Sequence, residues 1–379
     1  MTYYDLVVIG GGVSGAFTTY FALLKGFSVA LVELNHLGSG SSGRSAGIHT
    51  TQLVLPIDIE LSKRSMSIYS ELCPEGFSRT GFLSVEPEWM SKYSAQLLED
   101  AGVRYRVLSQ DELRDTFGWA VYDDNEVGVY TPDDGVADIP KILDSLRLRF
   151  REIGAELYEG REVVDLNIER SRLTLGGTST QTSLGFGSLV LAAGGWNRGL
   201  SRRWLRYDLP VALYACQVIL LKTVANCGLT PVYFENSHLY VRSMGADRLL
   251  AGNGGVVKLK DPLSCPPSPE PQYLLELSEK LGARLKSPEH FYPCGGWTGV
   301  CSSSPDGLPL VGRVPGLENV YIIDGLNGYG IMRAPALAQD LVKQISKDGE
   351  PESLRGLHPA RFGSTCAEPQ EVIELHSML

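Results

Sequence analysis

Three glycines are the residues with the clearest chemical use in this sequence. Gly10, Gly12 and Gly15 fit the spacing G-x-G-x-x-G, with Val13 and Ser14 between the last two. In this pattern the first glycine allows a tight turn, the second lets a diphosphate approach the backbone, and the third lets a helix pack closely on a strand. A helix that begins here offers free N–H groups and the positive end of its dipole to phosphates. The spacing therefore predicts a dinucleotide-binding site that includes all five residues.

The residues on either side supply the elements that such a site needs. Residues 5–9 are mostly apolar and β-branched, which is typical of a strand buried on both faces, and residues 28–33 form a second run of this kind. A helix is expected between them, ending at Gly26. Glu33 ends the second strand, where a carboxylate can accept hydrogen bonds from ribose hydroxyls. An acid at this position disfavours the 2′-phosphate of NADP, which leaves NAD and FAD.

A loop of small residues follows Glu33. Residues 37–47 are almost entirely Gly, Ser and Ala, with Arg44 as the single cation. Such a loop exposes N–H groups and hydroxyls without side-chain bulk, so a large cofactor can lie along it. Composition alone would also suit a flexible linker. The cofactor contacts predicted here are Ser41, Ser42, Arg44, Ser45, Ala46 and Gly47.

Further segments, in order along the chain, favour the cofactor loop over the linker. They are Asp-Gly-Val-Ala-Asp-Ile-Pro at 134–140, Leu-Val-Leu-Ala-Ala-Gly-Gly-Trp at 189–196, residues 304–312 and 320–330, and His-Pro-Ala-Arg-Phe at 358–362. Together with the loop they resemble the motifs of the FAD-dependent D-amino-acid oxidase, glycine oxidase and sarcosine oxidase superfamily over about residues 4–362. The resemblance implies FAD as cofactor. It points to the amine or amino-acid dehydrogenase branch, which includes the β subunit of dye-linked proline dehydrogenase.

The resemblance also extends the list of cofactor residues. A helix expected from about Pro335, with Ala338, Leu341, Val342 and Ile345 on its inner side, would aim its N-terminus at the flavin. A packing helix with a glycine-rich entry is the alternative. The added cofactor residues are Val163, Ala193, Gly194, Trp196, Gly325, Asn327, Gly328, Tyr329, Gly330 and Ile331.

The expected fold class is α/β. A Rossmann-like FAD-binding domain of the glutathione-reductase type would comprise residues 1–83, 134–200 and 294–362, and a C-terminal tail would comprise 363–379. An α+β substrate domain, residues 84–133 and 201–293, would interrupt it. Residues 214–221, 238–242 and 248–252 have the pattern of strands in an antiparallel sheet, the last two joined through 244–247. A helix capped by Asp138 and ended by Gly154 is also expected.

Family chemistry implies transfer of a hydride from the α-carbon of a small amino acid or secondary amine, resembling proline, sarcosine or glycine, to flavin N5. This reaction needs a cation that holds the substrate carboxylate, and Arg333 is the candidate. Tyr240 and His49 are the other candidate catalytic residues, although aromatic residues in strands and single histidines are usually packing residues. A solvated arginine at a helix start is the alternative for Arg333.

Several positions depart from the family pattern. Cys301 stands where amino-acid oxidases carry an arginine, and Gly299 where sarcosine oxidases carry a flavin-linking cysteine. Met332 takes the place of a lysine in the glycine-rich segment, and a lysine expected near Leu250 is missing. The departures predict FAD bound without a covalent link and a dehydrogenase rather than a direct oxidase, with the electron acceptor left open.

Composition limits the other function classes. Lys and Arg number 34 against 44 Asp and Glu, for a net charge of −10, so no basic face for nucleic acid is expected. The 7 cysteines never occur as Cys-x-x-Cys, which argues against metal sites and favours reduced thiols in the cytoplasm. The uncharged stretch 6–24 contains the glycine turn, so it is assigned to a strand and a helix rather than to a membrane span.

Three alternatives stay open. The same fold could oxidise a 2-hydroxy acid, or the chain could be a non-catalytic subunit that holds flavin within a larger complex. A pyridine-nucleotide enzyme is the third. A homo- or hetero-oligomer is compatible with each of them.

Overall fold

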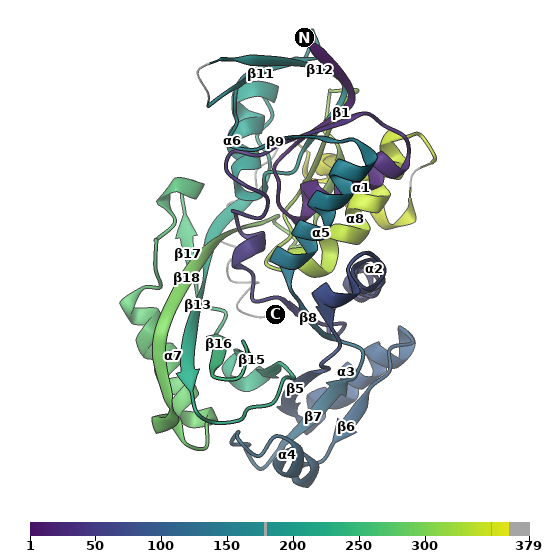
Figure 1. Ribbon diagram of the computed structural model, residues 1–379. Helices are drawn as coiled ribbons and strands as arrows, with labels where there is room; N and C mark the ends of the chain where they lie inside the picture. The colour runs from purple at the N-terminus through teal and green to yellow at the C-terminus, as the bar shows by residue number, and fades with distance from the viewer. Residues whose placement is uncertain (178–179, 350, 364–379) are drawn as a thin grey trace.

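Two large sheets dominate the computed structural model, which describes residues 1–177, 180–349 and 351–363 (Figure 1). The first sheet has eight strands, in which β20, β12, β1, β2 and β9 pair in parallel in that order. Its members are β1 (Thr2–Ile9), β2 (Val29–Val32), β9 (Glu156–Tyr158), β10 (Glu162–Asn167), β11 (Arg172–Gly176), β12 (Thr182–Leu191), β19 (Leu310–Arg313) and β20 (Val320–Asp324).

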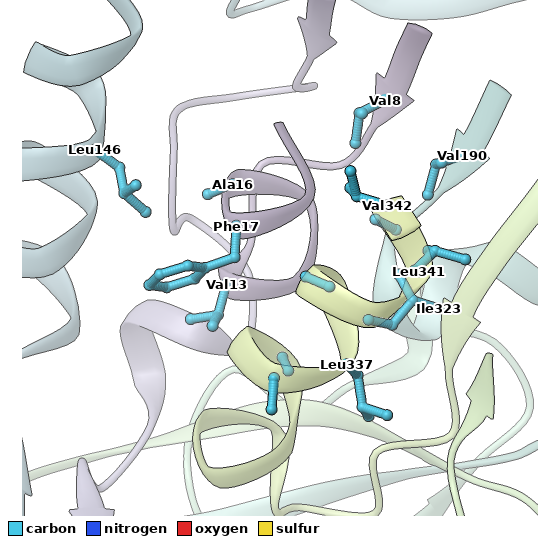
Figure 2. Close-up of a cluster of buried hydrophobic side chains, with 14 of the residues drawn as sticks. Val8, Val13, Ala16, Phe17, Leu146, Val190, Ile323, Leu337, Leu341 and Val342 are labelled. Atoms are coloured by element: carbon cyan, nitrogen blue, oxygen red, sulfur yellow. The ribbon is translucent and has the colours of Figure 1, made fainter. Parts of the chain in front are cut away.

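Helices cover one face of this sheet because its central strands are apolar on both sides. Every residue of β2 and β20 is buried. The covering helices are α1 (Val13–Leu24), α5 (Ile139–Ile153) and α8 (Gly330–Ile345), with α2 (Pro56–Leu72) packed on α8. Figure 2 shows their shared core, in which Phe17 of α1 and Leu341 of α8 lie among side chains from the sheet and from α5. This core places the first turns of α1 and α8 beside each other at one edge of the sheet.

The predicted ends of two helices are confirmed. The carboxylate of Asp138 accepts a hydrogen bond of 3.1 Å from the N–H of Lys141, which caps α5. Gly154 follows α5 with φ +100°, and Gly26 follows α1 with φ +82°, a backbone conformation that favours glycine.

The expected start of α8 at Pro335 is wrong, because the helix begins five residues earlier, at Gly330. A proline inside a helix has no N–H for the carbonyl four residues before it, which here belongs to Ile331. The hydroxyl of Tyr69, from α2, donates a hydrogen bond of 2.8 Å to this carbonyl. The helix therefore continues through Pro335 with its free acceptor satisfied. Its inner residues Ala338, Leu341, Val342 and Ile345 are buried as predicted.

The second large sheet has nine strands and is mostly antiparallel. The three strands expected from the sequence are present as β13, β15 and β16, and residues 244–247 join the last two. The sheet also takes in residues 291–303, which extends it past the boundary expected at 293. Its members are β5 (Phe82–Pro87), β6 (Arg106–Leu108), β7 (Glu126–Thr131), β13 (Ala212–Thr223), β14 (Val232–Phe234), β15 (Leu239–Ser243), β16 (Arg248–Gly252), β17 (Val256–Leu259) and β18 (Phe291–Ser303).

Smaller elements connect the two sheets. The third sheet consists of β3 (Ile48–His49), β8 (Gly135–Ala137) and β4 (Phe77–Ser78). The second sheet carries α3 (Glu88–Asp100), α4 (Gln110–Thr116) and α7 (Pro271–Arg284), while α6 (Asn197–Leu200) follows β12. Across the described residues, none of the helices is both long and apolar enough to span a membrane.

Candidate functional site

The predicted cofactor residues meet at one edge of the first sheet. The carboxyl ends of β1, β2, β12 and β20 lie there, and the glycine turn, Glu33, residues 193–196 and residues 325–331 follow these four strands directly. Because neighbouring parallel strands end on the same side, segments far apart in the chain come together at this edge. Val163 lies on β10 and is buried, and the N–H of nearby Arg161 donates to the carbonyl of Glu33 at 3.0 Å.

Of the three motif glycines, Gly12 is the one beside which a ligand has room. A Cβ added to Gly10, which has φ +109°, would lie 2.5 Å from the carbonyl oxygen of Ala192. A Cβ added to Gly15 would lie 1.8 Å from the carbonyl oxygen of Gly10. At Gly12 the nearest atom is the flexible hydroxyl of Ser42, at 3.0 Å. Gly10 and Gly15 are thus required by packing, whereas the space beside Gly12 is closed only by a side chain that can move.

Glu33 and the serine-rich loop lie against this turn. Glu33 accepts hydrogen bonds from the N–H of Gly11 at 2.7 Å and of Asn35 at 2.9 Å. Ser42 accepts one from the N–H of Val13 at 3.0 Å. Ser42 begins a short turn that ends at Arg44, and Ser45, Ala46 and Gly47 lead from it into β3.

Strand β18 of the second sheet crosses over this loop. The indole N–H of Trp297 donates to the carbonyl of Arg44 at 2.8 Å, and the Arg44 guanidinium donates to the carbonyl of Thr298 at 3.3 Å. The hydroxyl of Ser41 donates to the carbonyl of Val300. Three hydrogen bonds therefore tie the loop to the second sheet, and one of them engages the side chain of Arg44, which the sequence predicts as a cofactor contact.

Asp324, at the end of β20, is a further candidate that the sequence analysis did not single out. Its Oδ1 accepts hydrogen bonds from the Ser302 hydroxyl and from the N–H of Gly325, while its buried Oδ2 has no partner among the described residues. Burial raises the pKa of Asp324 to about 6. Asp324 could have been identified from the sequence because it directly precedes Gly325 within residues 320–330, one of the segments that resemble the family's motifs.

Residues 326–329 connect the edge of the first sheet to the second sheet. The side-chain oxygen of Asn327 accepts a hydrogen bond of 2.9 Å from the hydroxyl of Tyr214 on β13, and its N–H donates to the carbonyl of Ser302 on β18 at 2.9 Å. Tyr329 caps the start of α8, and the guanidinium carbon of Arg333 lies 5.0 Å from the centre of its ring.

Arg333 does not have the free guanidinium expected of a substrate anchor. It is 2% exposed, and it forms two hydrogen bonds with the carboxylate of Asp58, at 2.8 and 2.6 Å. Its remaining terminal nitrogen donates to the carbonyls of Gly307 and Leu326. A buried pair of this geometry holds α2 and α8 together, so the role assigned to Arg333 from the sequence is corrected to a structural one.

His49 also belongs to the protein core. It is fully buried, its Nε2 lies 3.1 Å from the carbonyl oxygen of Ser62, and its ring packs edge-on against Tyr69 and Phe77. Burial lowers its pKa to about 4, so the ring is neutral at ordinary pH. The catalytic role considered for His49 is therefore replaced by packing.

The second sheet brings the remaining candidates together on one face. Residues directly opposite each other on paired strands share a face, and successive residues alternate between faces. Tyr233 opposes Tyr240, Arg242 opposes Leu250, and Tyr214 opposes Cys301. We define the polar face by six side chains, which are Tyr214, Cys216, Tyr233, Tyr240, Arg242 and Cys301. The opposite face carries the apolar core that packs under α4 and α7.

Arg242 is the cation of the polar face that the sequence analysis missed. A Cβ added to Gly47 would lie 3.6 Å from its Nη2, so its guanidinium lies beside the cofactor loop. Its Nε is buried without a partner, and Nη1 donates only a 3.3 Å hydrogen bond to the carbonyl of Ser243. It forms no ion pair with a described residue, and burial lowers its pKa. A buried guanidinium without a carboxylate is costly unless a ligand supplies one.

Tyr240 lies two residues before Arg242 and is half-buried on the same face. Its hydroxyl lies against Gly252, where an added Cβ would approach it to 2.3 Å. Burial raises the pKa of Tyr240 and also that of Tyr329, so both phenols stay protonated and can donate. Of the three catalytic candidates, only Tyr240 lies on the polar face.

Two thiols complete the polar face. The sulfur atoms of Cys216 and Cys301 lie 3.4 Å apart, and both residues are free thiols. The contact with Cys301 and burial raise the pKa of Cys216. The other described cysteines, including Cys294, are free as well, while Cys366 lies outside the described residues.

Comparison with known proteins identifies relatives over almost the whole chain. The model of the family described as "DAO: FAD dependent oxidoreductase" matches residues 5–344. Glycine oxidase of Geobacillus kaustophilus is 24% identical, and the alignment covers 93% of this chain and 96% of that protein. 4-Methylaminobutanoate oxidase (formaldehyde-forming) of Paenarthrobacter nicotinovorans is 26% identical over 91% of this chain, which spans only 44% of that longer protein.

The fold is shared with solved structures as well. The crystal structure of L-proline dehydrogenase from P. horikoshii superposes with a TM-score of 0.85 at 22% identity, covering 95% of this chain and 98% of the other. At this level of identity the similarity establishes the mixed α/β fold and no more.

Proposed function

The chain belongs to the FAD-dependent oxidoreductase family matched over residues 5–344, and we propose that its substrate is a small amino acid or secondary amine that carries a carboxylate. One observation carries this proposal. Arg242 is a half-buried arginine on the polar face, beside the cofactor loop, whose Nε is buried without a hydrogen-bond partner and which forms no ion pair with a described carboxylate. The names of the relatives, which include a glycine oxidase and a 4-methylaminobutanoate oxidase, describe small amines with a carboxylate and support this substrate class.

The residues at the edge of the first sheet fit FAD. We infer a Rossmann-like domain of the glutathione-reductase type, in which Gly12 leaves room for the diphosphate and Glu33 accepts from the ribose. The unpartnered Oδ2 of Asp324 is a buried acceptor that a hydroxyl of the cofactor would satisfy. We propose non-covalent binding, because Gly299, in place of the family's flavin-linking cysteine, has no nucleophile.

The polar face accounts for the other requirements of the reaction. FAD bound at the edge would supply the acceptor for a hydride from the substrate's α-carbon. Arg242 would hold the substrate carboxylate, and the Tyr240 phenol would donate a hydrogen bond beside it. The covering sheet and the Tyr214–Asn327 hydrogen bond would keep bulk water from the reacting carbon.

We also propose the domain division as a functional one. An FAD-binding part, residues 1–83, 134–200 and 304–362, would hold the cofactor, and the second sheet with its helices would hold the substrate. Here the boundary expected at 294 moves to 304 because β18 runs to Ser303. Leu250 and Met332, in place of the family's lysines, favour a dehydrogenase over an oxidase. Cytoplasmic location and oligomer formation stay predictions.

Anaerobic flavin reduction tests the substrate class. The purified holoprotein is mixed with glycine, sarcosine, proline, dimethylglycine and 4-methylaminobutanoate, and separately with 2-hydroxy acids of matched size. We expect at least one amine to bleach the visible flavin band. Bleaching by hydroxy acids alone would show a 2-hydroxy-acid dehydrogenase, and bleaching by neither panel would favour a flavin-holding subunit. Reoxidation by air or by a dye then identifies the acceptor.

Replacing Arg242 tests whether this residue binds the substrate carboxylate. Arg242→Met keeps the length of the side chain and removes its charge, so the substrate carboxylate loses its partner. Loss of a buried, hydrogen-bonded charge pair costs about 2–5 kcal/mol, which corresponds to a Kd higher by about 30-fold to several thousand-fold. Arg248→Met, on the exposed part of β16, is the matched control. Equal loss of FAD and substrate in Arg242→Met would make Arg242 a cofactor residue instead.

A further inference from the structure

Two carboxyl groups lie side by side at the border of the polar face. β14 pairs in parallel with β5, and Phe234 is in register with Val85. The next residue in each segment is a glutamate: Glu86 is still on β5, and Glu235 begins the 3-10 turn that follows β14. Burial raises the pKa of Glu235, and the nearby charge of Glu86 adds to this effect. Tyr233 is on the polar face opposite Tyr240, and Glu235 follows it by two residues, next to Glu86 of the paired strand.

Neither glutamate has a cationic partner among the described residues. Glu86 is 2% exposed, with Oε2 accepting a 3.2 Å hydrogen bond from the Ser94 hydroxyl of α3 and Oε1 without any partner. The half-buried side chain of Glu235 forms no hydrogen bond or ion pair within the described part of the chain. Uncharged side chains flank the pair, namely Ser84 of β5, Ser94, and Tyr233, which is hydrogen-bonded to His238.

A nearby buried glutamate, Glu126, does have a cationic partner, so the lack of one is particular to Glu86 and Glu235. Glu126, on β7, is 1% exposed and forms two hydrogen bonds of 2.7 Å with the guanidinium of Arg284. The amide of Asn236, next to Glu235, also donates to Glu126 at 3.1 Å. The same region of the fold therefore satisfies one buried carboxylate fully and leaves the adjacent pair without a cation.

We propose that Glu235, with Glu86 behind it, accepts the proton that the substrate's ammonium group must lose before its α-carbon can give up a hydride. This inference rests on the proposed function. The N–H bond of the ammonium breaks, its electron pair stays on nitrogen, and an O–H bond forms on the Glu235 carboxylate. The nitrogen lone pair is then free to form the C=N bond of the imine product as the hydride leaves. Glu86 is a positioning residue, since it acts through its charge on Glu235.

The acid strength of the pair suits this task. Burial raises the pKa of Glu86 to about 7, and burial together with Glu86 raises that of Glu235 to about 7. A base works best when its pKa is close to the working pH, because it is then ionised and still binds a proton well. An approaching ammonium would also neutralise the carboxylate that the site otherwise leaves uncompensated.

The pH dependence of flavin reduction in the holoenzyme tests the proposal. Glu235→Gln keeps the shape of the side chain but cannot take a proton. We expect its rate of reduction at low amine concentration to fall by about 10²- to 10³-fold at pH 7. The loss of rate relative to the parent should shrink about tenfold per pH unit, because the fraction of neutral amine in solution rises by this factor. It should vanish near the pKa of the free amine, where no proton acceptor on the protein is needed. A purely structural defect would not be repaired by raising the pH.

Two further variants complete the test. Glu86→Gln removes the charge next to Glu235, so the acidic limb of the rate profile should move to lower pH. Glu279→Gln, on the exposed side of α7, is the matched control and should keep the parent profile. Carboxyl ¹³C NMR of labelled protein provides a readout besides activity, in which the signal of highest pKa should disappear in Glu235→Gln or Glu86→Gln.

The outcomes separate this inference from the proposed function. If amines reduce the parent flavin and Glu235→Gln keeps the parent rate and profile, only the proton-acceptor role is overturned. A deficit that is the same at every pH would also overturn it. If no amine reduces the parent flavin, the proposed function fails and this inference fails with it.

Discussion

The edge of the first sheet and the polar face of the second sheet are built in different ways. At the edge, the tightest contact joins Gly10 and Gly15, which are close in sequence, and it involves backbone atoms, as does the contact of Gly10 with the distant Ala192. On the polar face, Tyr214 and Cys301 are neighbours across β13 and β18 although they are far apart in the chain. A site made of backbone is visible as a local spacing, whereas a site made of side chains depends on strand register.

The largest expected effects test the edge, where two glycines differ in what surrounds them. Gly15→Val would force a side chain onto the Gly10 carbonyl, so the protein should fail to fold or lose most of its stability. Gly12→Val meets only the Ser42 side chain, so the fold should survive while FAD is lost. Flavin absorbance and circular dichroism of purified protein measure the two effects.

Gly40→Ala, in the same region of the chain, is the control because an added Cβ there meets no atom within 4 Å. Full flavin content in Gly12→Val would contradict the placement of the diphosphate. A stable, flavin-loaded Gly15→Val would contradict the packing derived for the helix and strand.

The next effect tests the region behind the edge, where Arg333 pairs with Asp58. Arg333→Ala leaves a buried carboxylate without a partner, which should lower the free energy of unfolding by about 3–5 kcal/mol. Chemical denaturation measures the loss. The double variant Asp58→Leu with Arg333→Met removes both charges and should recover most of it. If Arg333→Ala kept the parent stability but lost substrate binding, the original assignment as anchor would return.

The smallest effect concerns the border of the polar face. Because burial raises the pKa of Glu86 to about 7, the folded protein binds its proton more tightly than the unfolded chain does. This favourable contribution is complete below about pH 4.5 and is lost as the pH rises through 7. Glu86→Gln should therefore raise Tm by about 2 °C at pH 8 and little at pH 5. An equal change at both pH values would show that Glu86 does not titrate near neutrality.

The sequence predicted those turns and helix ends that are determined by a few adjacent residues. The glycine turn, the cap at Asp138 and the ends at Gly26 and Gly154 depend on a few adjacent residues, and the structure contains them. The start of α8 was wrong because a proline usually marks a first turn, and the Tyr69 hydroxyl that allows an interior Pro335 comes from a distant helix.

The predicted substrate anchor was Arg333 rather than Arg242, because the sequence shows local motifs but not contacts between distant segments. Arg333 follows the glycine-rich segment directly, so its position in the chain suggested a role that its contact with Asp58 excludes. Arg242 has no neighbouring motif, and its position depends on the pairing of β15 with β14 and β16. No local pattern indicates which of two arginines lacks a carboxylate partner. Glu86 and Glu235 were missed for the same reason.

The crossing of β18 over the serine-rich loop has a consequence for how the holoprotein assembles. The Trp297–Arg44 and Ser41–Val300 hydrogen bonds enclose the path along which we place the cofactor. Loading would then have to precede the docking of this strand, and exchange with free nucleotide would require the strand to detach. We expect colour to persist through prolonged dialysis and to be lost only when the strand is released by mild denaturant.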